Sequence, residues 1–98
     1  MNGMKAEIRW LTFEEGGRRS LPTGPMYVAP AKFLAHSEKW GVEDWSLVVE
    51  KIENADGSKE WLTNVWFGME DAPHEWLSSG SSFELYEGCR CVGIGRII

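Results

Sequence analysis

The sequence has few of the residues from which catalytic and metal sites are usually built. It contains two cysteines and two histidines among 98 residues, and no Ser-His-Asp or Cys-His spacing indicates an assembled nucleophile. A zinc site would need two ligands besides Cys89 and Cys91, and only His36 and His74 are present outside the carboxylates. We therefore expect no catalytic residue, no metal and no cofactor, and we interpret Cys91 as a small wall residue.

Long apolar segments and nucleotide-binding motifs are also missing. No apolar run approaches the roughly 20 residues that a membrane helix needs. Residues 1–6 lack the apolar core of a signal peptide, so we expect a cytoplasmic protein with reduced cysteines. The pair Gly16-Gly17 is not followed by G-K-[ST], which argues against a P-loop and a bound nucleotide. The net charge of −5 disfavours non-specific binding to nucleic acids.

The residues that are abundant favour β-structure. Hydrophobic residues make up 43% of the chain and charged residues 26%, which is typical of one soluble globular domain. Polar and apolar side chains alternate in several segments, and the segment 54–58 is a strong turn signal. We expect strands over 5–12, 26–34 with Pro30 marking an edge or a bulge, 45–52, 60–69, 81–86 and 90–98. The prediction is an all-β single domain over residues 1–98, folded as a small closed six-stranded antiparallel β-barrel.

Two motifs at the ends of the chain carry a family resemblance. Residues 83–95 resemble the closing hairpin of the third domain of translation elongation factor Tu, in which an alternating strand precedes E-G-G-R-T-V-G-x-G. Cys89 and Cys91 replace the second Gly and the Thr of that pattern. Residues 6–20 resemble the first strand of the same domain and its E-G-G-R-H-T loop. The resemblance implies that this chain is a stand-alone copy of that barrel.

The resemblance also implies a set of contact residues. In elongation factor Tu the third domain packs on the GTPase domain and touches the T-stem of aminoacyl-tRNA. These RNA contacts come partly from the E-G-G-R-H loop and from the Glu-Gly of the closing hairpin. By motif, the corresponding positions are Arg18, Arg19, Glu87 and Gly88, with Arg90 beside them. Arg19 stands where the family has histidine, and the GTPase motifs are not present in this sequence.

The alternation predicts the core of the end strands. We expect the buried residues there to be Ile8, Trp10, Phe83, Leu85, Val92 and Ile94. In the last strand, Arg90, Val92 and Ile94 would then share one face, and Cys91, Gly93 and Gly95 the other. We expect Gly93 and Gly95 to resist substitution, because a side chain there would meet a neighbouring strand or overfill a narrow barrel.

Aromatic residues are numerous for a barrel of this size. Six tryptophans, four phenylalanines and two tyrosines exceed what we expect one narrow interior to hold, so some should lie outside and mark an interface. Residues 65–69 are apolar on both faces, which means that both faces are buried or that one is offered to a partner. The candidates for an exposed aromatic patch are Trp40, Trp45, Trp61, Trp66 and Phe67.

Three functions from different classes follow from these observations. We favour a non-catalytic protein-interaction module, with an immunity- or antitoxin-like protein, a translation component and a homodimer as its variants. The second is RNA contact through an arginine patch, and the third is a small enzyme with an unrecognised pocket. The acidic pairs Glu14-Glu15, Glu43-Asp44 and Glu70-Asp71 flank turns and are interpreted as solvated charge. The predicted binding residues are Arg18, Arg19, Glu87, Gly88, Arg90, Trp61, Trp66 and Phe67.

Overall fold

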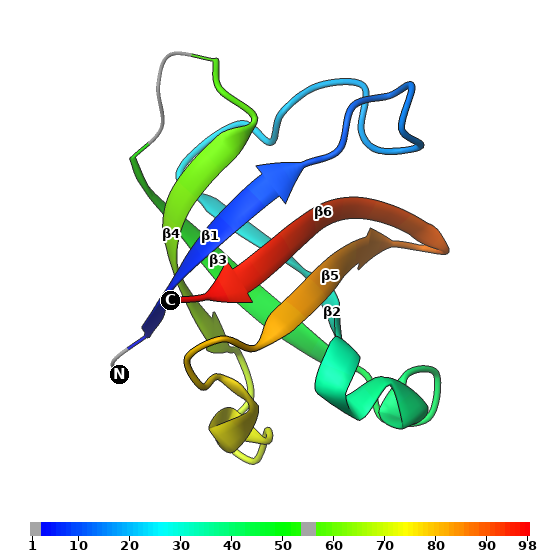
Figure 1. Ribbon diagram of the computed structural model, residues 1–98, viewed down its shortest axis with the longest axis vertical. Helices are drawn as coiled ribbons and strands as arrows, with labels where there is room; N and C mark the ends of the chain where they lie inside the picture. Colours follow the sequence, from blue (N-terminus) through cyan, green and yellow to red (C-terminus); the bar gives the residue numbers. More distant parts are fainter. Residues whose placement is uncertain (1–2, 54–56) are drawn as a thin grey trace.

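The computed structural model describes residues 3–53 and 57–98, whose backbone forms one closed antiparallel barrel (Figure 1). The strands are β1 (Met4–Trp10), β2 (Met26–Phe33), β3 (Trp45–Glu53), β4 (Glu60–Phe67), β5 (Ser82–Glu87) and β6 (Arg90–Ile97). Two short 3₁₀ segments, η1 (Leu34–Lys39) and η2 (His74–Trp76), lie in the β2–β3 and β4–β5 connections. The predicted all-β, six-stranded barrel is confirmed. The turn predicted over 54–58 lies partly outside the described residues.

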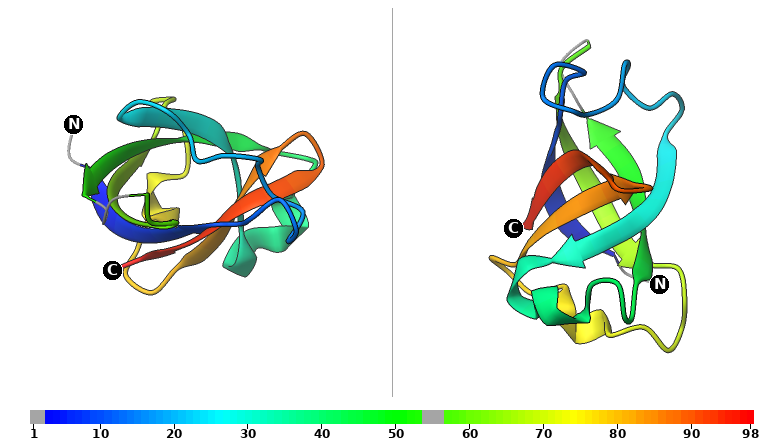
Figure 2. Two further views of the ribbon diagram at one scale, coloured as in Figure 1. Left: turned by 90° about the horizontal axis from the view of Figure 1, so that it is seen from above. Right: turned by 90° about the vertical axis from the view of Figure 1, so that its right-hand side faces the viewer.

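The barrel closes between the first and the last strand. The strand order is β1-β4-β3-β2-β5-β6, and β1 pairs with β6 from Ala6 opposite Ile97 to Trp10 opposite Gly93. Seen from above, the strands enclose a ring, with β1 and β6 side by side (Figure 2). No helix of the described residues is long and apolar enough to cross a membrane.

Period-two alternation places the core as the sequence predicts along most strands. In β1, Ala6, Ile8 and Trp10 are buried, because successive side chains of a strand point to opposite faces. In β4 the buried positions include Thr63, whose hydroxyl donates a hydrogen bond of 2.8 Å to the Ala6 carbonyl. This bond satisfies the one buried polar side chain of the described core.

A β-bulge in the closing hairpin changes which face of β6 is buried. Leu85 pairs with Gly93 and Tyr86 pairs with Cys91, so Val92 is an extra residue on β6. Val92 and Gly93 are therefore both buried, and the alternation shifts by one residue beyond them. The prediction of a buried Ile94 is wrong: Ile94 faces outward and is 39% exposed.

The strand that contains Pro30 is not interrupted. β2 runs through Pro30, which lies opposite Ser46 of β3. Pairing of β2 with β5 begins only at Ala31, directly after the proline. Before that residue β2 pairs with β3 alone. The predicted edge is therefore limited to the part of β2 that ends at Pro30. The missing N–H of Pro30 costs no hydrogen bond to β5, because β2 is not paired with β5 there.

Glycines on the inner face make room for large rings. The buried aromatic side chains of the interior are Trp10, Phe33, Trp61, Phe67 and Phe83. A Cβ atom on Gly93 would lie 3.1 Å from the Trp10 ring, and one on Gly95 would lie less than 3.0 Å from three atoms of the Phe83 ring. Because the two glycines have no side chains, they leave space for these rings. The barrel interior therefore holds more aromatic side chains than its size alone predicts.

Candidate functional site

The two end motifs of the sequence, residues 6–20 and 83–95, meet at one end of the barrel. Arg18, in the loop after β1, forms an ion pair with Glu87 at the end of β5. Tyr27 of β2 donates a hydrogen bond to the same carboxylate, and the Arg18 guanidinium lies 5.7 Å from the centre of the Tyr27 ring. The structure thus brings Arg18 and Glu87 together as an internal tie between loop and hairpin. Sequence patterns did not single out Tyr27 as the third member.

A second contact fastens the same loop to the hairpin. Arg90 of β6 donates a hydrogen bond of 3.5 Å to the Gly17 carbonyl. Gly17 is buried, and a Cβ there would overlap the Leu11 carbonyl group, so only glycine allows this close approach. Gly88 sits in the hairpin turn with a φ of 63°, a conformation that favours glycine. Arg90 and Gly88 therefore have structural roles at this end.

Arg19 is oriented differently from the other motif arginines. Its guanidinium lies 4.7 Å from the centre of the Phe13 ring, and both residues are exposed. Within residues 3–53 and 57–98, Arg19 has no ion pair. Of the three motif arginines, Arg19 is the one with neither an ion pair nor a side-chain hydrogen bond within the described residues, so its guanidinium donors are available to a ligand.

The environment of Glu87 shifts the pKa of two groups in opposite directions. Burial raises the pKa of Glu87, but hydrogen bonds from Tyr27 and Arg18 and the positive charge of Arg18 together leave it below the ordinary 4.5. Burial, reinforced by the hydrogen bond to Glu87, raises the pKa of Tyr27, so its hydroxyl remains a donor at neutral pH. The tie is therefore held by a charged carboxylate and a protonated phenol.

Replacing Glu87 by glutamine should remove part of the acid sensitivity of the fold. Because the folded pKa lies below the unfolded one, ionised Glu87 contributes stability above the unfolded pKa, and this contribution is lost as the pH falls through the folded pKa. We expect Glu87→Gln to be less stable than the wild type at neutral pH, and the difference to be smaller at a pH below the folded pKa of Glu87. Urea unfolding at both pH values measures this, and a difference independent of pH would contradict it.

Two of the five aromatic residues in the predicted exposed patch lie inside the barrel, whereas Trp40, Trp45 and Trp66 are half-buried. Trp61 is 3% exposed and Phe67 is 1% exposed, so their placement on an exposed patch is wrong. Trp66 lies on the outer face of β4, half-buried, opposite Val48 of β3. Val48 is in turn paired with the exposed Val28 of β2, so these three residues form a short apolar row across the outside of the sheet.

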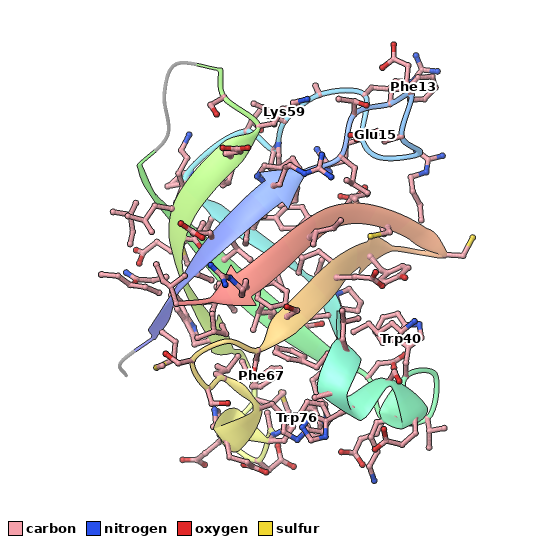
Figure 3. The ribbon with its side chains drawn as sticks, in the orientation of Figure 1. Phe13, Glu15, Trp40, Lys59, Phe67 and Trp76 are labelled. Atoms are coloured by element: carbon pink, nitrogen blue, oxygen red, sulfur yellow. The ribbon has the colours of Figure 1, made fainter. Side chains whose placement is uncertain are left out.

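At the opposite end of the barrel, the two 3₁₀ segments contact one another. The His36 ring of η1 stacks on the Trp76 ring of η2, with the ring centres 4.2 Å apart. Trp40 packs against Tyr86 of β5 at 4.9 Å, which fixes the end of η1 on the barrel wall. Trp40 and Trp76 mark this end in Figure 3. Connections that are far apart in sequence thus form one surface.

This surface is strongly acidic. The two connections, residues 34–44 and 68–81, carry one lysine, Lys39, and six exposed carboxylates: Glu38, Glu43, Asp44, Glu70, Asp71 and Glu75. Their combined charge of −5 equals the net charge of the whole chain. We call this surface the acidic end. The pairs Glu43-Asp44 and Glu70-Asp71 are visible in the sequence. Interpreting each pair separately as the charge of a turn does not reveal that both lie at the same end of the barrel.

The acidic end also exposes apolar side chains. Val42 is 84% exposed, Met69 is 58% exposed and Leu34 is 48% exposed. They come from both connections, and the half-buried Trp40 and Trp76 rings lie on the same segments. Exposed apolar groups surrounded by charge of one sign are typical of a surface that contacts another protein.

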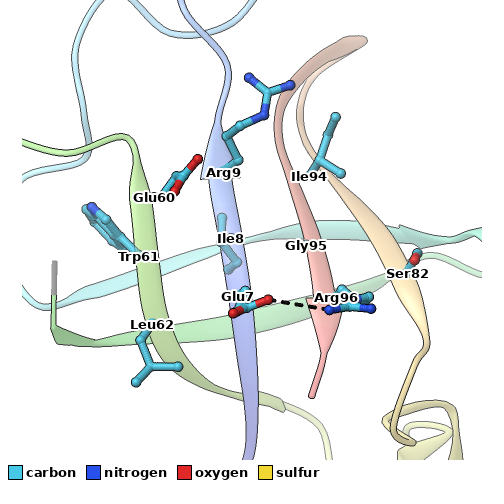
Figure 4. Close-up of a pocket in the computed structure, with 10 residues that line it drawn as sticks. All are labelled: Glu7, Ile8, Arg9, Glu60, Trp61, Leu62, Ser82, Ile94, Gly95 and Arg96. Carbon is cyan, nitrogen blue, oxygen red and sulfur yellow. Dashed lines mark ion pairs between the residues drawn. The ribbon is translucent and has the colours of Figure 1, made fainter.

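A shallow groove runs over the outside of β4, β1 and β6 (Figure 4). Its rim carries two carboxylates, Glu7 and Glu60, and two guanidinium groups, Arg9 and Arg96. Glu7 and Arg96 are paired at 3.6 Å, and Arg9 pairs with Glu15 of the neighbouring loop. Both guanidinium groups are therefore neutralised and Glu60 has no ion pair in the described residues, so the groove has no positive charge to offer an anion.

The cysteines and histidines form no group that indicates chemistry. Cys89 is exposed and Cys91 half-buried, both as free thiols, and burial raises the pKa of Cys91. His74 shares a hydrogen bond of 2.9 Å with the Glu70 carbonyl, and His36 is stacked on Trp76. In the part of the chain that the structure describes, no three His, Cys, Asp or Glu side chains are placed to hold a metal ion.

Comparison of this chain with models of known protein families and with curated proteins finds no match in either case. The class of the molecule is therefore defined by its architecture, a small closed six-stranded β-barrel with an arginine-containing loop at one end and an acidic surface at the other. The resemblance of its end motifs to elongation factor Tu stays a prediction.

Proposed function

We propose that this protein is a non-catalytic binding module that contacts a positively charged protein partner through its acidic end. One observation carries the proposal: the charge of the acidic end equals that of the chain, and the same two connections expose Val42, Met69 and Leu34. Charge of one sign steers an oppositely charged partner to a surface, and apolar groups at its centre supply affinity once the surfaces meet. A basic toxin or a basic translation component has the required charge.

The acidic side chains are available for such a contact. Glu43 accepts a hydrogen bond from the Trp45 indole and Asp44 accepts one from the Gly41 amide, so these two also shape the loop. Glu38, Asp71 and Glu75 form no ion pair within the described residues. A partner with lysine or arginine side chains would therefore meet carboxylates that no internal cation neutralises.

RNA contact at the other end is the second candidate, and Arg19 is the observation that favours it. Arg19 is exposed and stacked on Phe13, an arrangement that suits phosphate or base contact. Arg18 and Arg90 are tied to Glu87 and Gly17, so the cluster offers less free charge than its sequence implies. The acidic net charge also works against this candidate.

Charge reversal at the acidic end tests the proposal. The double variant Glu38→Lys/Asp71→Lys takes one residue from each connection, and neither side chain has a described hydrogen bond within the chain. We expect it to lose about tenfold or more in affinity for a basic partner captured from a lysate and identified by mass spectrometry. The matched control Glu14→Lys/Glu60→Lys makes the same change in net charge away from the acidic end, at two carboxylates without an ion pair in the described residues, and should bind like the wild type.

The outcome of this capture separates the candidates. Equal loss in both double variants would show that net charge alone matters and would refute a defined surface at the acidic end. Capture of RNA that Arg19→Gln abolishes would favour the second candidate instead. Light scattering of the purified chain would reveal a homodimer, and a dimer disrupted by Glu38→Lys/Asp71→Lys would make the partner a second copy.

A further inference from the structure

A pocket of about 390 Å³ lies at the end of the barrel opposite the acidic end, and we call it the mouth pocket. The end of β1, the loop after it and Lys59, which directly precedes β4, form its walls, and Phe13, Glu15 and Lys59 mark this region in Figure 3. The Trp10 amide donates a hydrogen bond of 2.8 Å to the Lys59 carbonyl, which fixes the two walls to one another. Pockets of this volume are in the range that holds small molecules.

The charged groups around the mouth pocket favour an anion. Its lining includes Arg18, Arg19 and Lys59 and one carboxylate, Glu14. Arg18 is neutralised by Glu87, whereas Arg19 and Lys59 have no ion pair in residues 3–53 and 57–98. Two free cations against one carboxylate leave a positive surplus, in a protein whose net charge is negative.

A buried donor without a partner lies in the lining of the mouth pocket. Trp10 lines the pocket and is 1% exposed, and its Nε1–H donates to no described acceptor. The neighbouring Trp61, with its ring centre 5.1 Å away, has the same unpartnered group. Leaving a buried donor unpaired is costly. The Trp10 Nε1 atom has almost no accessible surface, so the indole N–H reports binding in the pocket as a neighbour of the ligand and not as its hydrogen-bond donor.

The apolar part of the lining indicates the rest of the ligand. Phe13 is 51% exposed with Arg19 stacked on it, and Leu11 and Leu21 contribute aliphatic surface to the walls. We infer that the mouth pocket binds a small organic anion, a carboxylate on a flat apolar ring, with the carboxylate between Arg19 and Lys59. The ring would then lie against Phe13 and the aliphatic walls, close to Trp10. This site is independent of the proposed protein contact at the acidic end.

Nuclear magnetic resonance of the ¹⁵N-labelled chain tests this inference with benzoate as the probe. The Trp10 indole N–H gives its own cross-peak, which Trp10→Phe assigns. We expect benzoate to shift this cross-peak progressively, whereas the uncharged analogue benzamide leaves it in place. The double variant Arg19→Gln/Lys59→Gln should weaken benzoate binding about tenfold or more, because it removes both charge-assisted hydrogen bonds. The other cross-peaks report whether this variant is folded.

Several results would overturn the inference. These are an unshifted Trp10 cross-peak at millimolar benzoate, an equal shift with benzamide, and unchanged binding in the folded double variant. Inorganic phosphate that shifts the cross-peak as strongly as benzoate would refute the organic part of the ligand. Benzoate binding that persists in Glu38→Lys/Asp71→Lys would support a site separate from the acidic end, whatever that variant does to protein capture.

Discussion

Replacing Gly95 by alanine is expected to destabilise the barrel by about 1–3 kcal/mol. The new Cβ would lie less than 3.0 Å from three atoms of the Phe83 ring. Phe83 is fully buried and its ring lies 5.3 Å from that of Phe33, so it has little space into which to move. Backbone and rings must shift together, which is how overpacking lowers the free energy of unfolding.

Gly68→Ala is the matched control for this prediction. A Cβ on Gly68 would meet only Val48, at an ordinary contact distance of 3.7 Å, and the residue lies on the surface. We expect its stability to be unchanged or slightly increased, because alanine restricts the unfolded chain more than glycine does. Urea unfolding of both variants measures the difference. A Gly95→Ala protein as stable as Gly68→Ala would contradict the packing described for the barrel interior.

Leu85→Ala is expected to cost about 2–5 kcal/mol, the largest loss that we predict for a truncation. Leu85 is 0% exposed. Its Cδ1 packs beside Gly93 and would lie 3.5 Å from a Cβ atom built on that glycine. Truncation would leave a cavity between β5 and β6 that the closed sheet cannot collapse to fill.

The comparison with Ile94→Ala tests the β-bulge. Ile94 is opposite Glu84 on the outer face and is 39% exposed, so its truncation should cost less than about 1 kcal/mol. Without the bulge at Val92, both residues would point inward and both truncations would be severe. Similar losses for Leu85→Ala and Ile94→Ala in urea unfolding would therefore show that the register of β6 is not the one described.

The strands could be predicted because alternation and turn residues are local signals. Ile8 and Trp10 share the inner face of β1 in the sequence pattern and in the structure alike. The bulge at Val92 could not be predicted in this way, because it depends on how many residues β5 places opposite β6. A shift of one residue reverses the face of everything beyond it, and Ile94 shows the consequence.

The interior volume was the second quantity that the sequence did not reveal. Counting aromatic residues suggested a surplus, but Trp61 and Phe67 fit inside because Gly93 and Gly95 contribute no side-chain volume beside the Trp10 and Phe83 rings. The glycines were recognised as packing residues. How many aromatic rings the interior can hold follows only from the pairing of β6 with β1 and β5, because this pairing places the two glycines beside the rings.

The candidate site was predictable in part. The structure does bring Arg18 and Glu87 together, as an internal ion pair with Tyr27. The acidic end required knowledge of the topology, since Glu38 and Asp71 are 33 positions apart and share one end of the barrel only because the β2–β3 and β4–β5 connections contact one another there. Each connection carries only a few acidic residues, but the two connections lie at the same end of the barrel and together form one acidic surface.

Hydrogen–deuterium exchange of the complex with the captured partner tests the proposed function most directly. We expect binding to slow amide exchange in the connections 34–44 and 68–81, while the loop over 12–20 and the hairpin turn at 87–90 exchange as in the free protein. The result that would contradict the account is a complex in which both connections exchange at the free rate and protection appears elsewhere. Protection over the outer row of Val28, Val48 and Trp66, or over the Arg19 loop, would place the partner on a different surface.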